Sequence, residues 1–329
     1  METGWTTAGE VSVLVNGAAT APGKLPCRVV PRDDSPPERW AASHQGEIQG
    51  LLRQHGAVLF DGFPIFDVAS FSAFASKLCP RLFGGNFEHP LVHGSDCVYW
   101  TTPYPPQHRL LFHNENAHLP SWPGLILFGC IQPAAQGGET LLADSAEVLK
   151  VLPTAVVERF RDKGVRYQRI FGGGLGLDWR VAFRTKDREV VDSICLQQGN
   201  EHTWLADDRL RLRWWRPATQ IRPRSGQEVW FNQVTHFHPS LLPGDMGAQI
   251  RSLYGTEELP RNCTYGDGSP IDDDVAQAIS LAFDGLAFGQ AWERGQVLLV
   301  DNMRLAHGRQ PYTGERRIAV AFGEMQNDS

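Results

Sequence analysis

The chain has 329 residues and a formal net charge of −6 at pH 7, and 21% of its residues are charged. Lysine and arginine are scattered along the sequence, which argues against a nucleic-acid partner and against an anionic membrane surface. Six cysteines stand far apart without a CxxC pair, which argues against a zinc ribbon and a redox dithiol. Ten tryptophans, 17 phenylalanines and 33 glycines are typical of a turn-rich β core with aromatic walls.

The length of the chain allows one large domain or two ordinary ones, and we favour a single domain over residues 1–329. Residues 1–22 are polar and rich in glycine, alanine and threonine, which predicts a flexible N-terminus without a secretory signal. No stretch approaches the roughly 18 apolar residues that a membrane-spanning helix requires. We therefore expect a cytoplasmic protein.

Hydrophobic spacing predicts the elements of the first half. A helix is expected over residues 37–54, followed by Gly56 as a stop and a buried strand over 57–60. A second helix is expected to begin with Asp67 as its N-cap. Three further strands are expected over 108–112, 125–131 and 140–143. A helix after the capping pattern at Asp144 is expected to break at Pro153.

The second half is less regular. Residues 164–223 show no clear period, and we expect a loop or lid insertion there. The glycines within 172–176 form no GxGxxG between a strand and a helix, so a phosphate-binding loop is not expected. Strands are predicted over 228–232, 296–300 and 317–322, and a helix is predicted over 273–283. Together these elements favour a mainly β barrel or sandwich with flanking helices.

Two segments far apart in the chain carry the strongest chemical signal. His113 and Glu115 form an HxE pair, and His307 lies 194 residues after His113. On a strand, residues i and i+2 point to the same face, so this pair could bind one ion while Asn114 points elsewhere. Two imidazoles and one carboxylate on one face of a redox-active iron leave the other positions open. We therefore expect an iron site at these three residues.

Several motifs accompany the HxE pair in a fixed order. They are HGAVLFDGF at 55–63, FHNE at 112–115, SWP at 121–123, GGET at 137–140, VWFNQ at 229–233, YGDGS at 265–269 and the stretch 292–317. With this set the sequence resembles the iron(II)/2-oxoglutarate-dependent oxygenases of the taurine dioxygenase family, above all the syringomycin-biosynthesis type of amino-acid hydroxylase. The resemblance implies a double-stranded β-helix (jelly-roll, cupin-like) core, with Fe(II) as cofactor and 2-oxoglutarate and O2 as cosubstrates.

The resemblance also implies roles for single residues. His113, Glu115 and His307 would bind the metal. Thr140 would contact the 2-oxoglutarate carboxylate, and Arg316 or Arg317 would clamp it with a bidentate fork. Adjacent strand residues face opposite sides, so only one of the two arginines is expected to reach it. Arg309 and His118 are weaker candidates for substrate contacts.

The implied reaction is the hydroxylation of an amino acid, free or carried on a peptidyl carrier protein, in secondary-metabolite biosynthesis. Glu115 fills the position that related halogenases leave vacant for chloride, which disfavours halogenation. Desaturation, epoxidation and cyclisation stay open. Thr-Pro-Tyr-Pro at 102–105 and Ala-His at 117–118 depart from the pattern of the subgroup, which argues against a β-hydroxyaspartate-type specificity.

Two alternatives belong to other classes of protein. The same three ligands could hold zinc in a metallohydrolase with a bound water as nucleophile, although Thr140 and the arginine pair then have no role. A catalytically silent barrel could bind a ligand or carrier protein, although an intact ligand triad argues against this.

Five other polar or aromatic residues are interpreted as structural. His236 and His238 imitate a ligand pair at strand spacing, but nothing pairs with them at the expected place, so we interpret them as loop or core residues. Trp230 is interpreted as packing in the wall of the core. Asp301 and Asn302 are expected to hold the turn that aims the distal histidine.

Overall fold

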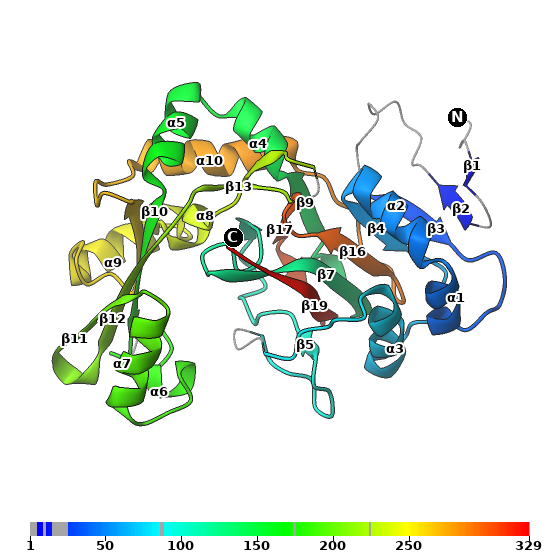
Figure 1. The fold of residues 1–329 in the computed structure, drawn as a ribbon, viewed down its shortest axis with the longest axis horizontal. Helices are drawn as coiled ribbons and strands as arrows, with labels where there is room; N and C mark the ends of the chain where they lie inside the picture. The colour runs from blue at the N-terminus through cyan, green and yellow to red at the C-terminus, as the bar shows by residue number, and fades with distance from the viewer. Residues whose placement is uncertain are drawn as a thin grey trace. The chain divides into compact units, whose positions relative to one another are not determined.

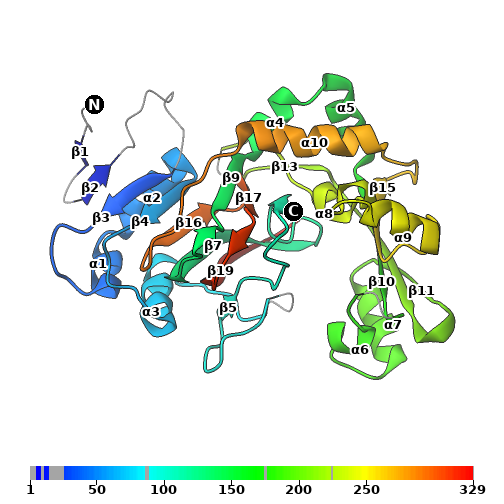
Figure 2. The same cartoon turned by 180° about the vertical axis from the view of Figure 1, so that it is seen from behind.

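The computed structural model describes residues 5–8, 11–14, 26–85, 89–173, 176–223 and 225–328, and most of the N-terminal segment expected to be flexible lies outside them. The chain divides into two compact units (Figures 1 and 2). Unit 1 comprises Met1–Leu110, Ser121–Ala143 and Ala287–Ser329, and unit 2 comprises Leu111–Pro120 and Asp144–Leu286. The single domain expected over 1–329 stays a prediction. Within the described residues, no helix is long and apolar enough to cross a membrane.

The main sheet of unit 1 has eight strands in the order β1-β2-β3-β4-β16-β7-β19-β5. Their bounds are β1 Trp5–Ala8, β2 Val11–Leu14, β3 Cys27–Val30, β4 Ala57–Phe60, β5 Val98–Trp100, β7 Ser121–Gln132, β16 Val297–Asp301 and β19 Arg317–Asn327. Figure 1 shows β16, β7 and β19 side by side, so strands from distant parts of the chain share the centre of the sheet. Pairing is antiparallel throughout except between β3 and β4.

Both faces of this sheet are covered, which explains the nearly continuous apolar run of β7. Val58 and Phe60 of β4 belong to a core cluster with residues of the helices α1 Pro37–Ser43, α2 Gln45–His55 and α3 Val68–Leu78. Ala57 and Leu59 point to the opposite face and pack in a second cluster with Leu142 and Leu305. The alternation of β4 therefore separates two cores.

The helices of unit 1 follow the predicted pattern with one difference. The single helix expected over 37–54 is two helices, because the backbone at His44 leaves the helical region with φ −110° and ψ 17°. Gly56 ends α2 with φ 79°, the left-handed conformation that glycine adopts at little cost. Asp67 caps α3 and accepts from the Ser70 N–H, as expected.

A phenylalanine cluster anchors α3 to the sheet, and Phe74→Ala is expected to lower the free energy of unfolding by about 3–5 kcal/mol. The Phe74 ring is fully buried, with its centroid 5.1 Å from that of Phe60 and 5.4 Å from that of Phe63. Denaturation in urea measures the loss. Phe66, which is 47% exposed, provides the matched control, and an equal loss in Phe66→Ala would contradict the assignment.

A smaller three-stranded sheet has the order β6-β17-β9, with β6 at Leu110–His113, β17 at Leu305–Arg309 and β9 at Thr140–Asp144. Next to these elements in sequence, β8 Gln136–Gly137 pairs with β18 Tyr312–Thr313. His113, Thr140 and His307 lie on these strands, and Glu115 follows the end of β6 by two residues. The strands predicted over 108–112 and 140–143 are confirmed to within about two residues.

Unit 2 combines helices with a four-stranded antiparallel sheet of order β11-β12-β10-β15 and a two-stranded sheet of β13 and β14. Its strands are β10 Val165–Phe171, β11 Glu201–Trp204, β12 Leu210–Arg216, β13 Thr219–Ile221, β14 Glu228–Trp230 and β15 Arg261–Tyr265. Its helices are α4 Ser145–Val151, α5 Thr154–Lys163, α6 Trp179–Ala182, α7 Arg188–Gln197, α8 Val234–Phe237, α9 Met246–Tyr254 and α10 Asp273–Leu286, with 3₁₀ turns η1 Ala206–Asp208 and η2 Pro239–Leu241. The break at Pro153 between α4 and α5 occurs as predicted.

The segment 164–223 therefore contains regular elements where a loop was expected. In the first half of β12 buried leucines alternate with arginines, which is the two-residue period of a half-buried strand and is already visible in the sequence. A role as a lid stays a prediction. Strands and helices both make up substantial parts of the chain, so it is less dominated by β structure than the sequence predicts.

Candidate metal centre

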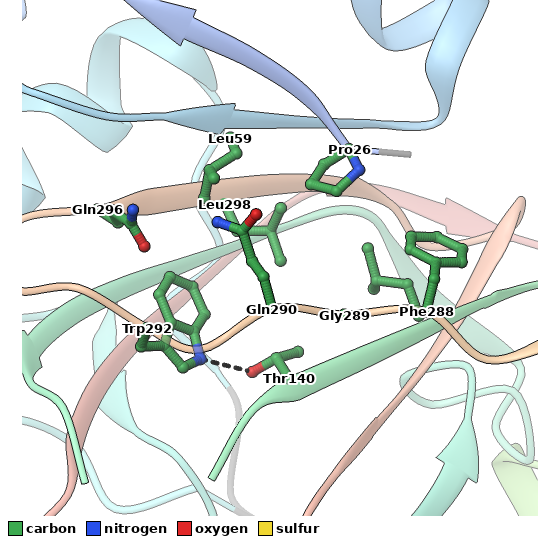
Figure 3. A pocket seen from close by; sticks show the side chains of 10 residues that line it. Pro26, Leu59, Thr140, Phe288, Gly289, Gln290, Trp292, Gln296 and Leu298 are labelled. Atoms are coloured by element: carbon green, nitrogen blue, oxygen red, sulfur yellow. Dashed lines mark hydrogen bonds between the residues drawn. The ribbon is translucent and has the colours of Figure 1, made fainter. Parts of the chain in front are cut away.

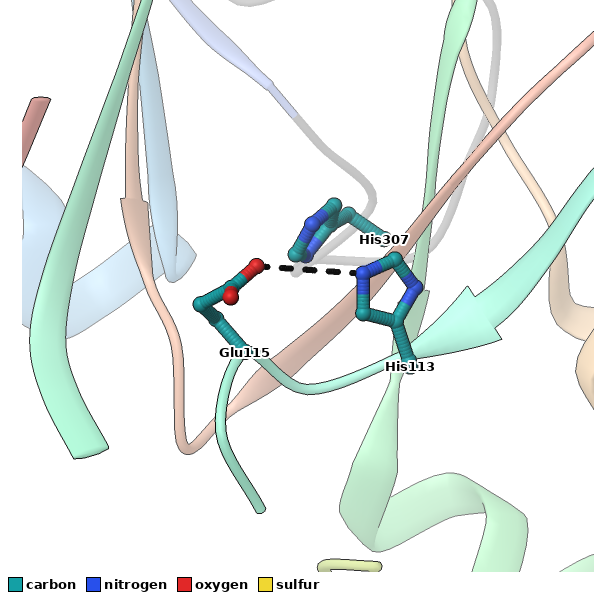
Figure 4. Close-up of side chains that lie close together, drawn as sticks. All are labelled: His113, Glu115 and His307. Atoms are coloured by element: carbon teal, nitrogen blue, oxygen red, sulfur yellow. Dashed lines mark ion pairs between the residues drawn. The ribbon is translucent and has the colours of Figure 1, made fainter. Parts of the chain in front are cut away.

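His113, Glu115 and His307 come together at one point (Figure 4). The Nε2 atom of His113 lies 3.8 Å from a carboxylate oxygen of Glu115, and one ligand atom from each residue lies within 4.8 Å of the others. The three residues are 8%, 5% and 6% exposed. Ligand atoms that each lie about 2.1 Å from one ion and share one face of it are about 3 Å apart, so these three side chains would draw closer together on binding a metal. Two imidazoles and one carboxylate fit iron(II) in this arrangement.

Glu115 lies in a turn, whereas the sequence predicts a strand through both members of the HxE pair. β6 ends at His113, and the Ala117 N–H then donates to the Asn114 carbonyl at 3.2 Å. Asn116 has φ 58°, a left-handed conformation that asparagine tolerates. The strand prediction is wrong at Glu115, yet its carboxylate still points toward the imidazole of His113 in Figure 4.

The orientation of the His113 ring is set by its own backbone. Its Nδ1 lies 3.1 Å from the Leu111 carbonyl oxygen, so Nδ1–H is the donor and Nε2 carries the lone pair that can bind a metal. The His236 ring packs against His113 with centroids 4.2 Å apart, and its Nε2 lies 3.0 Å from the same carbonyl. Burial, reinforced by the neighbouring His113, holds the pKa of His236 well below its usual value. His236 is therefore a neutral donor.

The two histidines interpreted as loop or core residues both lie in the interior. The His238 ring lies 2.9 Å from the Ile271 carbonyl oxygen and 2.8 Å from the Ser240 hydroxyl. Neither of these partners belongs to the HxE segment. Trp230 is fully buried against Phe160, which confirms wall packing. The contact of His236 with His113 is what the sequence interpretation missed, because the spacing of two histidines carries no information on which ring packs against a ligand.

His307 lies in the middle of β17, whose five residues are all buried. Its ring packs beside Phe128, with centroids 5.3 Å apart. The preceding turn is held by the Asp301 carboxylate, which accepts from the N–H groups of Met303 and Arg304, each at 3.1 Å. The Asn302 amide donates to the Pro123 carbonyl at 2.8 Å. The structural roles predicted for Asp301 and Asn302 are confirmed.

The structure separates the two arginines that follow His307. Arg316 donates to the Gly138 carbonyl at 2.9 Å, and its Nη2 lies 3.5 Å from the Thr140 hydroxyl. Arg317 is exposed, and its guanidinium lies 4.5 Å above the centre of the Trp100 ring. Only Arg316 therefore accompanies Thr140.

Arg316 has the properties of an anion-binding side chain. Among the residues that the structure describes, no carboxylate forms an ion pair with it. Burial, with a smaller effect of Arg309, lowers the pKa of Arg316 to about 10, so it still carries its charge at neutral pH. A largely desolvated guanidinium without a carboxylate partner fits an anionic ligand, which would restore the lost solvation.

A small cavity of about 20 Å³ lies beside Thr140 (Figure 3). The indole N–H of Trp292 donates to the Thr140 hydroxyl at 3.1 Å across one side of it. The remaining lining residues are Pro26, Leu59, Leu142, Phe288, Gly289, Gln290, Gln296 and Leu298. A space of this size holds about one water molecule, so it is not a substrate pocket.

The two weaker substrate candidates are both engaged elsewhere. Arg309 is 7% exposed and donates to three backbone carbonyls, those of Tyr104 at 3.1 Å, Pro105 at 2.8 Å and His108 at 2.7 Å. His118 is 4% exposed, and its ring lies among the aromatic rings of Tyr167, Trp214 and Phe237. Their roles as substrate contacts stay predictions.

Comparisons with known proteins agree on one family. The model of the family described as taurine catabolism dioxygenase TauD, TfdA family matches residues 26–322. The dapdiamide synthesis protein DdaC of Enterobacter agglomerans is 36% identical over 276 residues, which are 84% of each chain. A clavaminate synthase-like protein of Arabidopsis thaliana is 28% identical over 294 residues, covering 84% of this chain and 83% of the relative.

Solved structures share the fold at low identity. PvcB of Pseudomonas aeruginosa superposes with a TM-score of 0.57 at 12% identity, over 98% of this chain and 94% of the other. A taurine dioxygenase of Burkholderia xenovorans gives 0.53 at 13% identity, over 98% and 95%. With the family match and the His-Glu-His cluster, these likenesses identify the chain as a member of the TauD/TfdA family, an iron(II)/2-oxoglutarate-dependent oxygenase that uses Fe(II), 2-oxoglutarate and O2.

Proposed function

We propose that the protein oxidises an amino acid or an amino-acid-derived intermediate of secondary-metabolite biosynthesis, with hydroxylation as the expected outcome. The relative DdaC, whose name assigns it to dapdiamide synthesis, supports the substrate class. The observation that carries the proposal is the convergence of His113, Glu115 and His307 within 4.8 Å. The pairing of Thr140 with Arg316 disfavours a zinc hydrolase, in which neither has a role.

In this proposal the three clustered residues hold Fe(II), which on binding supplies the redox chemistry that couples decarboxylation of 2-oxoglutarate to substrate oxidation by O2. Thr140 and Arg316 orient the cosubstrate through one of its carboxylates, where the guanidinium fork provides two parallel charged hydrogen bonds. Arg317 lies on the surface and has no role in binding the cosubstrate in this proposal. The buried surroundings of all three ligands exclude water from the reacting atoms.

The proposal includes a double-stranded β-helix (jelly-roll, cupin-like) core. The antiparallel pairing of β4, β16, β7 and β19 and the packing of Leu142 and Leu305 against one face of that sheet support it. We place the protein in the cytoplasm, because its six cysteines are free. The single domain over 1–329 and the lid role of 164–223 belong to the same proposal.

The substrate is a small amino-acid-like molecule, either free or tethered to a peptidyl carrier protein. Glu115 as a ligand disfavours halogenation. Desaturation, epoxidation and cyclisation use the same oxidant, so mass analysis of the product separates them from hydroxylation: a gain of one oxygen atom supports our proposal. The roles of Arg309 and His118 as substrate contacts belong to the same proposal, and both side chains are buried.

Anaerobic addition of Fe(II) and 2-oxoglutarate to the metal-free protein tests the function. A weak visible charge-transfer band is expected with both, and none is expected when succinate replaces 2-oxoglutarate or when Zn(II) replaces Fe(II). A zinc hydrolase and a silent barrel give no band under any of these conditions. Absence of the band from a folded, iron-loaded sample would overturn the proposal.

A further inference from the structure

A short segment of unit 2 holds the backbone that carries His113 and Glu115. The segment covers residues 233–236 and includes the first turn of α8. Three of its side chains each lie within hydrogen-bond distance of a different backbone carbonyl of residues 111–114. The contacts are Gln233 Nε2 to the Asn114 oxygen at 3.0 Å, Thr235 Oγ1 to the Phe112 oxygen at 2.6 Å and His236 Nε2 to the Leu111 oxygen at 3.0 Å.

The hydrogen bonds of Gln233 and Thr235 lie in the interior, where each residue is 5% exposed, so water replaces a removed donor poorly. The Asn114 carbonyl also accepts from the Ala117 N–H, and the Leu111 carbonyl also lies 3.1 Å from His113 Nδ1, so removing Gln233 or His236 takes away one of two donors. A buried carbonyl that loses a donor is destabilised more than an exposed one, which water can still solvate. The path of the backbone through residues 111–114 is therefore tightly constrained.

The segment is itself fixed to the four-stranded sheet. The Gln233 N–H donates to the hydroxyl of Tyr167 at 2.9 Å, and Tyr167 is a fully buried residue of β10. The Asn232 side chain accepts from the Val234 N–H at 3.1 Å and donates to the Ala218 carbonyl at 2.9 Å. Because the segment is anchored at its N-terminal end, it provides a fixed support for the ligand strand.

Glu115 has particular need of such a support. It lies in a turn, so no strand ladder holds its backbone. The preceding Asn114 is held instead, at its carbonyl by Gln233 and at its side chain by Ser145, whose hydroxyl lies 3.2 Å from the amide nitrogen. His113 is held by the contact of its ring with that of His236, tilted by 38°, and by the Leu111 carbonyl that both rings share.

We propose that Gln233, Thr235 and His236 are positioning residues that preorganise His113 and Glu115 for iron. The inference rests on the proposed function, because it takes these two residues as metal ligands. Removing a group that orients a metal ligand typically lowers the metal affinity about 10–100-fold, although such a group never touches the ion. The segment thus contributes to the affinity of the site for the metal.

The test compares variants that keep or remove one donor. Thr235→Val removes the hydroxyl at nearly constant volume, and Thr235→Ser retains it. His236→Phe keeps an aromatic ring without the N–H, and Gln233→Met keeps the volume without the amide. His238→Phe is the control, because His238 is a buried histidine two residues away whose ring lies within hydrogen-bond distance of the Ile271 carbonyl.

Two readouts are required besides turnover: the Fe(II) dissociation constant of the metal-free protein and the visible spectrum of its Co(II) form, which reports coordination geometry. We expect Thr235→Val, His236→Phe and Gln233→Met to raise the dissociation constant about 10–100-fold and to alter the Co(II) spectrum. Thr235→Ser should restore affinity to within about twofold of the wild type, a rescue that a purely structural role does not predict.

The melting temperature of each metal-free variant separates positioning from general destabilisation. If His236→Phe and His238→Phe melt alike but only His236→Phe loses affinity for iron, the inference holds. It is overturned if the variants of the segment bind Fe(II) as His238→Phe does. Failure of the proposed function looks different, because His113→Ala would then bind Fe(II) as tightly as the wild type.

Discussion

His113→Ala and His307→Ala are each expected to fold but to lose Fe(II) binding and succinate formation. Each change removes one of three ligands from a buried site in which water reaches the vacated position poorly. The loss of affinity should exceed about 100-fold, the upper end of the range for groups that only orient a ligand. Metal content after anaerobic loading and release of succinate from 2-oxoglutarate measure the two losses.

His93→Ala is the control for these variants, because His93 is an exposed histidine outside the cluster. It should retain iron and turnover. Unchanged succinate formation in either ligand variant would refute the assignment of His113 or His307, whatever its effect on stability.

Arg316→Ala is expected to raise the dissociation constant for 2-oxoglutarate at least about 10-fold, since one charged hydrogen bond is worth about 1.5–3 kcal/mol. Arg317→Ala should change it by less than about twofold, because an exposed guanidinium over an aromatic ring contributes only about 0.5–1 kcal/mol to local packing. Arg316→Lys should recover only part of the affinity, because an ammonium keeps the charge without the planar fork.

Titration of the charge-transfer band with 2-oxoglutarate measures all three constants. The adjacent pair is a stringent internal control, since both changes remove the same side chain from neighbouring positions of the chain, at the start of β19. Equal effects of Arg316→Ala and Arg317→Ala, large or negligible, would reject a clamp by Arg316 alone.

The sequence predicts those parts of the fold that depend on local chemistry. The helix stop at Gly56 follows from one glycine, and the buried strand over 57–60 follows from four apolar residues. The left-handed φ of Gly56 and the bounds of β4 agree with these predictions. The cap at Asp67 and the break at Pro153 are likewise local. The ligand types are also readable, because a metal constrains which side chains can bind it.

The remaining features depend on tertiary structure. The choice between Arg316 and Arg317 requires the register of β19, which shifts by a bulge against β7 between Arg317 and Ile318, and no residue in the sequence marks that bulge. The turn at Glu115 depends on anchors more than a hundred residues away in Gln233 and Thr235. β12 is different, because its Leu-Arg-Leu-Arg alternation is a local strand signal, and only its pairing with β10 and β11 depends on tertiary structure.

The hydrogen bonds from Arg309 to the backbone of residues 104–108 affect how the substrate specificity of such an enzyme can change. The guanidinium donates to three main-chain oxygens there, which every amino acid offers, and it also lies 5.8 Å from the centre of the Tyr104 ring. Side chains of residues 105–108 can therefore be exchanged while the course of the loop into β6 is preserved. New specificities can be selected at 105–108 without disturbing the strand that ends in His113.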